Sequence, residues 1–90
     1  MKIAILGAGA WGSALALLYA RDHDISLWVF EREQFEDMLS TRENRQFLPG
    51  FPLPPAITIE HDITNAVRGA DLHVRRGVGG DKGTRIVDQD

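Results

Sequence analysis

The chain contains no cysteine and only three histidines among its 90 residues. Without cysteine it can form neither a disulfide framework nor a thiolate metal site or nucleophile. The histidines, His23, His61 and His73, lie far apart and lack the paired spacing that metal ligands show. We therefore expect no metal site, and ordinary turn or surface positions for these side chains.

Long apolar runs and clustered basic residues are also missing. Glycines interrupt the first apolar stretch, and only one lysine precedes it, so it fits neither a secretory signal nor a membrane span of about 20 apolar residues. The formal charge of −3 gives no overall attraction to nucleic acid or anionic lipid. We expect neither nucleic-acid nor membrane partners, and the default location is cytoplasmic. The oligomeric state is left open.

What the sequence does contain is the composition of one small globular domain, with 43% hydrophobic and 26% charged residues. Short β-branched or aromatic runs alternate with helix-forming runs, which is typical of an α/β fold with a parallel sheet. The predicted strands are 3–6, 25–30 and 56–59, with a lead-in to a fourth at 69–72. The predicted helices are 11–21 and 31–45, with a short helix or turn at 61–68.

Residues 47–55, FLPGFPLPP, contain all four prolines of the chain. Because proline lacks an N–H and has a fixed φ, this segment should hold neither a helix nor a central strand. Its aromatic residues indicate an ordered loop rather than a flexible linker.

Three glycines, Gly7, Gly9 and Gly12, form the pattern G-x-G-x-x-G between the first predicted strand and the first predicted helix. In a dinucleotide-binding turn the first permits the tight turn, the second lets the backbone approach the pyrophosphate, and the third lets the helix pack closely. The unpaired N–H groups at the start of the helix would face the phosphates. The pattern therefore predicts a partial Rossmann-like parallel sheet flanked by helices. The alternative is a strand-to-helix turn without a ligand.

Glu31 follows the second predicted strand, about 20–25 residues after the first glycine, where a carboxylate can accept bonds from the adenosine ribose. A carboxylate would repel a 2′-phosphate, so NAD is favoured over NADP. The same residue could instead be a carboxylate in the first turn of the next helix, and the two roles are compatible.

The blocks ILGAGAWGSALA, LWVFERE and NRQFLPGFPLPPAITIEHD resemble the N-terminal domain of NAD-dependent sn-glycerol-3-phosphate dehydrogenase, over residues 1 to about 72. The resemblance implies that the whole turn from Gly7 to Gly12, Ala8 included, binds NAD. It implies that Ala10 and Trp11 belong to the pyrophosphate loop, and that Phe30 flanks the adenosine half. Ala10 stands where members often have Ser or Asn.

Simpler interpretations remain open for several of these residues. Trp11 could be an apolar plug over the start of the helix. Phe30 could belong to the strand core, and the FLPG loop could be turn punctuation alone. Asn44, Phe47 and Gly50 have no evident chemistry of their own, and none of the residues singled out is a credible proton-transfer catalyst.

The resemblance ends near Leu72, and residues 73–90 differ in character. In the family an apolar fourth strand is expected here, but the chain continues with Arg75 and Arg76, which suit a buried strand poorly. We expect residues 73–90 to be a disordered tail and propose a shift of reading frame near Leu72 as its origin. The alternatives are a natural short protein with a basic tail and, with less support, a nucleic-acid-binding arm.

The expected function is that of an NAD-binding fragment of a glycerol-3-phosphate dehydrogenase. The resemblance implies hydride transfer between NAD(P) and glycerol 3-phosphate or dihydroxyacetone phosphate in a full-length protein, in the supply of glycerophospholipid precursors. The family's catalytic lysines and its phosphate-binding Arg-Asn pair lie beyond the matching part, so no catalytic residue is assigned and the chain alone should not turn over substrate. The alternatives are a stand-alone NAD-binding or interaction module and a fragment of a hydroxyacyl-CoA or ketopantoate type of dehydrogenase.

Overall fold

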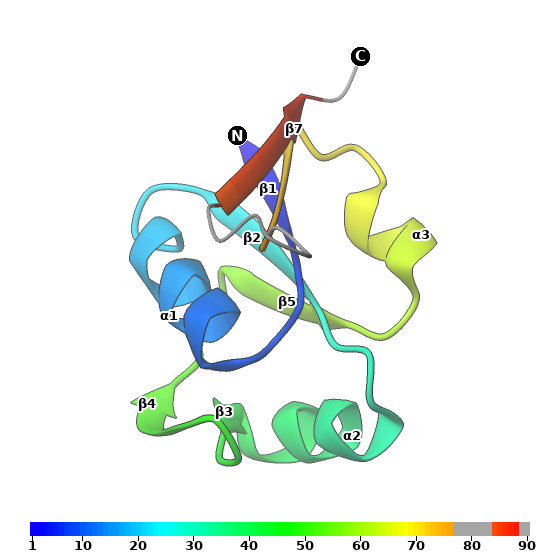
Figure 1. Ribbon diagram of the computed structural model, residues 1–90. Helices are drawn as coiled ribbons and strands as arrows, with labels where there is room; N and C mark the ends of the chain where they lie inside the picture. The colour runs from blue at the N-terminus through cyan, green and yellow to red at the C-terminus, as the bar shows by residue number, and fades with distance from the viewer. Residues whose placement is uncertain (77–83, 89–90) are drawn as a thin grey trace.

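The computed structural model describes residues 1–76 and 84–88. Five strands form one sheet in the order β5-β2-β1-β6-β7 (Figure 1). The first four in this order are parallel to one another, and β7 runs antiparallel to β6. The strands are β1 (Lys2–Leu6), β2 (Asp24–Trp28), β5 (Ile57–Glu60), β6 (Leu72–Arg76) and β7 (Thr84–Asp88).

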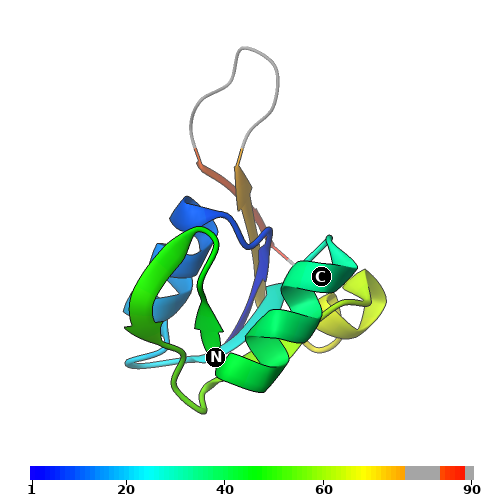
Figure 2. The same ribbon diagram turned by 90° about the horizontal axis from the view of Figure 1, so that it is seen from below.

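Two of the helices lie on opposite sides of the sheet. Helix α1 (Ala10–Tyr19) follows β1, and the short α3 (Ile63–Val67) follows β5. Figures 1 and 2 show α1 on one side of the sheet and α3 on the other. Helix α2 (Arg32–Thr41) follows β2. This alternation confirms the predicted α/β class and the Rossmann-like parallel sheet.

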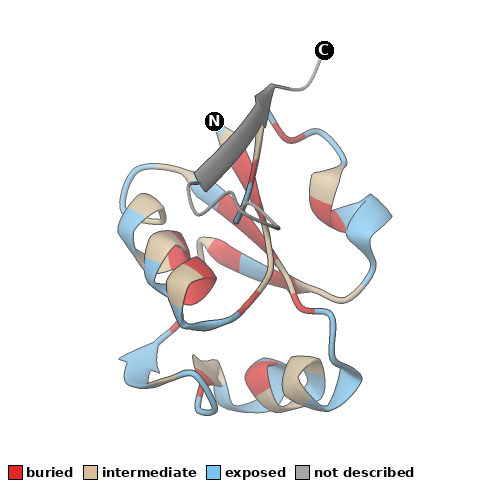
Figure 3. Cartoon of the chain, in the orientation of Figure 1, coloured by how far each residue is buried: buried red, intermediate tan, exposed pale blue. Residues whose placement is uncertain are grey.

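The core lies between the sheet and its helices (Figure 3). Many of its largest buried side chains come from the parallel strands, because strands covered on both faces bury residues in a continuous run. In β1 the residues Ile3, Ala4 and Ile5 are all buried. Ala16 of α1 and Met38 of α2 have no exposed surface and are the buried apolar residues that these helices contribute to the core.

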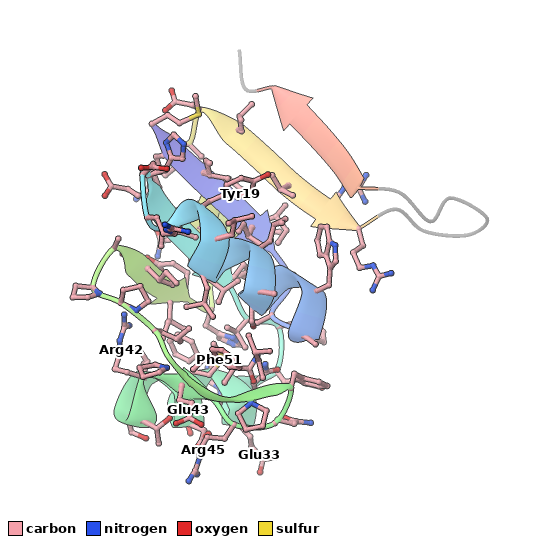
Figure 4. All side chains as sticks on the ribbon, turned by 90° about the vertical axis from the view of Figure 1, so that its left-hand side faces the viewer. Tyr19, Glu33, Arg42, Glu43, Arg45 and Phe51 are labelled. Carbon is pink, nitrogen blue, oxygen red and sulfur yellow. The ribbon has the colours of Figure 1, made fainter. Side chains whose placement is uncertain are left out.

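A two-stranded hairpin, β3 (Glu43–Asn44) and β4 (Leu48–Pro52), lies beside α2 at the end of the molecule away from β7 (Figures 1 and 4). The proline-rich segment thus contains a strand, but one outside the main sheet. Gly50 of β4 has φ of +89°, and its N–H donates to Oε2 of Glu43 at 2.7 Å. The prediction that 47–55 holds neither helix nor central strand is confirmed.

The residue between α2 and the hairpin, Arg42, has a left-handed backbone with φ of 54°. Its Nη2 donates to the carbonyl oxygens of Pro54 and Ile57, each at 2.8 Å, and of Leu53 at 3.3 Å. Figure 4 shows Arg42, Glu43 and Arg45 gathered where α2 meets the hairpin. Arg45 pairs with Asp37 at 2.6 Å, and this hydrogen bond raises the pKa of the guanidinium.

The structure differs from the expected tail at residues 73–76, which belong to β6. Val74 is buried and pairs with Ile5 of β1, whereas Arg75 and Arg76 are exposed at the end of the strand. The expectation failed because the two arginines lie beyond the residues of β6 that pair with β1, and their side chains are exposed, so no charge is buried. Residues 84–88 form β7, and the rest of the expected tail, 77–83 and 89–90, lies outside the described residues.

Candidate functional site

A cleft of about 510 Å³ opens at the carboxyl ends of β1 and β2. Register explains its position, because Leu6 and Trp28, the last residues of these strands, are paired neighbours and both line it. In open α/β sheets, ligands bind at the carboxyl ends of strands where the strand order reverses. Here the chain leaves β1 toward β2 on one side, and β6 lies on the other. The cleft therefore has the position expected of a ligand site.

The turn between β1 and α1 forms one wall of the cleft. Gly7, Gly9, Ala10, Trp11 and Gly12 all line it. These are five of the six turn residues that the sequence predicted as a cofactor-binding segment. The sixth, Ala8, is buried behind the turn with 7% of its surface exposed.

The three glycines have different structural reasons. Gly7 has φ of +139°, a backbone conformation that other residues rarely adopt. A Cβ atom at Gly12 would lie 2.0 Å from the carbonyl oxygen of Gly7, so only glycine lets α1 pack this close to the turn. Gly9 precedes the first residue of α1 with an ordinary φ of −77°, and a Cβ atom there would meet nothing within 4 Å. The space beside Gly9 is open to a ligand.

The other walls come from residues far apart in the sequence. Trp28 ends β2, and its Nε1 donates to the carbonyl oxygen of His61 at 2.9 Å. Ile63 opens α3 and lines the cleft, as do Arg75 and Arg76 of β6. The guanidinium carbon of Arg76 lies 5.6 Å from the ring centroid of Trp11, within cation–π range. Trp11 also packs against the core, so its roles as apolar plug and as cleft wall coexist.

Phe30 and Glu31 lie beside the cleft and do not line it. Phe30 is 70% exposed, so it is not part of the strand core, and its ring centroid lies 5.8 Å from that of Trp28. Glu31 is the residue before α2, and its side chain makes no capping hydrogen bond with the helix. It borders a second depression of about 350 Å³. Both side chains are exposed on the side where β2 ends.

Two residues that the sequence analysis gave no site role hold the turn from behind. Nε2 of Gln34 and Nδ2 of Asn44 donate to the carbonyl oxygen of Ala8 at 2.7 and 2.8 Å. Nδ2 of Asn44 also donates to Oγ of Ser13 at 2.7 Å. Asn44 is the first residue of the NRQFLPG block on which the resemblance rests. The sequence could not show its hydrogen bonds to Ala8 and Ser13.

The described lining of the cleft provides apolar and aromatic surface, backbone groups and two guanidinium groups. It contains no carboxylate, histidine or lysine that would transfer a proton. Residues 1–76 and 84–88 contain no group of three or more His, Asp or Glu side chains placed to hold a metal ion. Over the same part of the chain, none of the helices has the length and apolar character needed to cross a membrane. The arrangement suits binding of an anion joined to a flat ring.

Comparison with known proteins adds independent findings. The profile of the family described as "NAD-dependent glycerol-3-phosphate dehydrogenase N-terminus" matches residues 2–76. A glycerol-3-phosphate dehydrogenase [NAD(P)+] of Dechloromonas aromatica is 46% identical over 74 residues, which is 82% of this chain and 22% of that protein. An enzyme of the same name from Methylobacillus flagellatus is 49% identical over 74 residues, with the same coverage.

Solved structures agree with the sequence relatives. The crystal structure of a glycerol-3-phosphate dehydrogenase from Coxiella burnetii has a TM-score of 0.79 and 35% identity, over 82% of this chain and 23% of that one. The chain thus spans between a fifth and a quarter of the length of the relatives it matches. The match reaches Arg76, four residues beyond the boundary expected from the motifs.

Proposed function

Because the chain belongs to the family of N-terminal domains of NAD-dependent glycerol-3-phosphate dehydrogenases, we propose that its cleft binds NAD through the turn Gly7–Gly12. The observation that carries this proposal is the close packing of Gly12 on the turn, where an added Cβ atom would lie 2.0 Å from the carbonyl oxygen of Gly7. This close packing brings the start of α1 against the turn, where the helix's unpaired N–H groups would face the open space beside Gly9. A diphosphate placed there would accept hydrogen bonds from those N–H groups, and no side chain at Gly9 would block it.

The remaining candidate residues would contact the rest of the cofactor. Ala10 and Trp11 border the diphosphate position from the first turn of α1. Phe30 and Glu31 follow β2, on the side where the adenosine half would extend, and the Glu31 carboxylate would accept bonds from the ribose hydroxyls. That charge would oppose a 2′-phosphate, so we propose NAD rather than NADP as the preferred cofactor.

The activity of the longer relatives comes to this chain only as a proposal. In a full-length protein the domain would present NAD for hydride exchange with glycerol 3-phosphate or dihydroxyacetone phosphate, in the cytoplasm. Its described cleft offers no proton-transfer group. We therefore expect the 90-residue chain to bind cofactor without turning over substrate, and neither nucleic acid nor membrane has a part in this function.

A titration of NADH, followed by its fluorescence, tests the proposal. Gly9→Val should weaken binding by at least roughly tenfold, because the side chain would occupy the diphosphate position. Its φ of −77° and open surroundings let the variant fold. Ala14→Val is the matched control, since Ala14 is an exposed residue of α1 that does not line the cleft.

One result would contradict the binding proposal, and another would contradict the expectation that the chain alone has no activity. Equal NADH affinity in Gly9→Val and the wild type would place the ligand elsewhere or nowhere. NADH formation from glycerol 3-phosphate and NAD by the purified chain would contradict the separate statement that this chain lacks catalysis.

A further inference from the structure

The carbonyl group of Ala8 accepts hydrogen bonds from two side-chain amides that lie outside the cleft. Gln34 of α2 and Asn44 of β3 both donate to it, at 2.7 and 2.8 Å. Both residues lie on elements that come after β2 in the chain and pack behind the turn. Neither lines the cleft. Their target is the carbonyl of the peptide that joins Ala8 to Gly9.

This peptide has one group on each side. The carbonyl of Ala8 and the N–H of Gly9 belong to the same planar unit and, since the described chain has only trans peptides, point in opposite directions. With the carbonyl held toward Gln34 and Asn44, the Gly9 N–H must point away from them, toward the side on which Gly9 lines the cleft. The two amides thus determine which group of the peptide a ligand meets.

The flanking residues make such a constraint necessary. Rotation of the Ala8–Gly9 peptide changes ψ of Ala8 and φ of Gly9, and glycine adopts positive and negative φ about equally well. A rotated Ala8–Gly9 peptide would therefore face little steric opposition and would present a carbonyl oxygen to the ligand. An oxygen at that position would repel a phosphate, whereas an N–H would bind it.

Asn44 is itself held firmly enough to impose the orientation. It has 1% of its surface exposed, and its Nδ2 also donates to Oγ of the buried Ser13 in the first turns of α1. Its Oδ1 accepts from the N–H of Phe47 at 3.3 Å and from Nε2 of Gln34 at 3.4 Å. These contacts fix the orientation of the Asn44 side-chain amide. Its nitrogen faces Ala8 and Ser13, and its oxygen faces the N–H of Phe47 in the hairpin. Reversing the amide would set oxygen against oxygen at Ala8.

We propose that Asn44 and Gln34 are positioning residues for the dinucleotide, which hold the Ala8–Gly9 peptide with its N–H toward the cleft. The proposal rests on the proposed function, since the ligand gives the orientation its purpose. It gives the hairpin and α2 an indirect part in binding, although neither Gln34 nor Asn44 lines the cleft. Removing the donors should lower affinity in protein that remains folded.

Asn44→Asp and Gln34→Glu test this, because each keeps the shape of the side chain and replaces the donating NH₂ with a carboxylate oxygen. We expect each to weaken NADH binding roughly tenfold, the loss of about one buried hydrogen bond and its orientation. Asn65→Asp makes the same chemical change on the exposed face of α3 and should leave the affinity near that of the wild type. Affinities are compared per folded molecule, with the folded fraction taken from urea unfolding.

A second readout separates positioning from stability alone. The amide resonance of Gly9 in the ¹H–¹⁵N spectrum of the ligand-free protein should shift in Gln34→Glu, which is only half-buried and provides the test if Asn44→Asp fails to fold. Wild-type affinity in folded Gln34→Glu, with an unchanged Gly9 resonance, would overturn the inference while leaving the proposed function intact. Absence of NADH binding by the wild type would overturn the proposed function, and the Gly9 resonance would still decide whether the peptide is held.

Discussion

At position 12, an added Cβ atom would lie 2.0 Å from the carbonyl oxygen of Gly7, closer than real Cβ atoms come to any neighbour. The oxygen belongs to the backbone of the turn and cannot move without displacing the strand or the helix. We therefore expect Gly12→Ala to lower the free energy of unfolding by about 2–3 kcal/mol, as overpacking in a rigid site does. Urea unfolding followed by far-UV circular dichroism measures this.

Gly9→Ala is the matched comparison, because the same added methyl group meets nothing within 4 Å. Its free energy of unfolding should stay within about 0.5 kcal/mol of the wild type, the range usual for unremarkable surface changes. Equal losses in the two variants would show that the close packing of α1 on the turn is not what Gly12 provides.

Single residues also show how far sequence reasoning reaches. The pattern of Gly7, Gly9 and Gly12 predicted the turn and its place in the fold, because each step of the spacing has a backbone reason. Asn44 was different. Its importance depends on contacts with Ala8 and Ser13, 36 and 31 residues away, and no local pattern encodes such a contact.

Among the elements, the junction of α2 and the hairpin depends on Arg42. This residue has φ of 54°, and its guanidinium bridges three carbonyl groups near β5. We expect Arg42→Ala to lower the free energy of unfolding by about 2–3 kcal/mol, since it removes charge-assisted hydrogen bonds and keeps the left-handed backbone. Arg42→Gly loses the same bonds but relieves the backbone, so its loss should be smaller by about 1 kcal/mol.

Urea unfolding of both variants measures the difference. An alanine variant as stable as the wild type would show that the bridge to β5 does not hold the hairpin. The reverse ranking of glycine and alanine would show that the left-handed conformation carries no strain.

Strand β6 shows why an element can be misjudged from its own sequence. Adjacent arginines argued against a buried strand, but the strand buries Val74 and ends at the arginines. A short run cannot reveal where along a sheet it stops, because that depends on pairing with β1. The first three strands were easier to predict, since each is a short run rich in β-branched or aromatic residues.

The end of β6 should contribute charge to the cleft. Arg76 lines it beside Trp11, so we expect Arg76→Gln to weaken NADH binding about threefold, the scale of a solvent-screened charge contact. The dependence of affinity on salt should also become flatter. Arg21→Gln is the control, because Arg21 follows the far end of α1, about 15 Å of helix from the turn.

NADH titrations of both variants and the wild type at two salt concentrations test whether Arg76 contributes to binding. Arg76→Gln with the affinity and salt dependence of the wild type would exclude this guanidinium from the binding of the anion. A matching loss in Arg21→Gln would mean that overall charge, and not the position of Arg76, is responsible.

At the scale of the whole molecule, the described residues provide the part of the proposed dinucleotide site that surrounds the turn and the end of β2. Trp28, Phe30 and Glu31 extend it in the direction proposed for the adenosine half, whereas the part of the chain that matches is only 22–23% of the length of the relatives. We therefore expect ADP to stabilise the protein almost as much as NADH does, and nicotinamide mononucleotide to have little effect. A ligand at 100 times its dissociation constant adds about 2.7 kcal/mol to the free energy of unfolding.

Thermal unfolding with each ligand at equal concentration measures these differences as shifts of Tm. For a domain of this size, 1 kcal/mol corresponds to a shift of roughly 4–8 °C, so a half of the cofactor that binds is readily distinguished from a half that does not. A shift with nicotinamide mononucleotide equal to that with NADH would place the binding energy on the wrong half of the cofactor. Shifts with ADP and NADH that both vanish in Gly9→Val would tie the effect to the turn, because that side chain fills only the space beside Gly9.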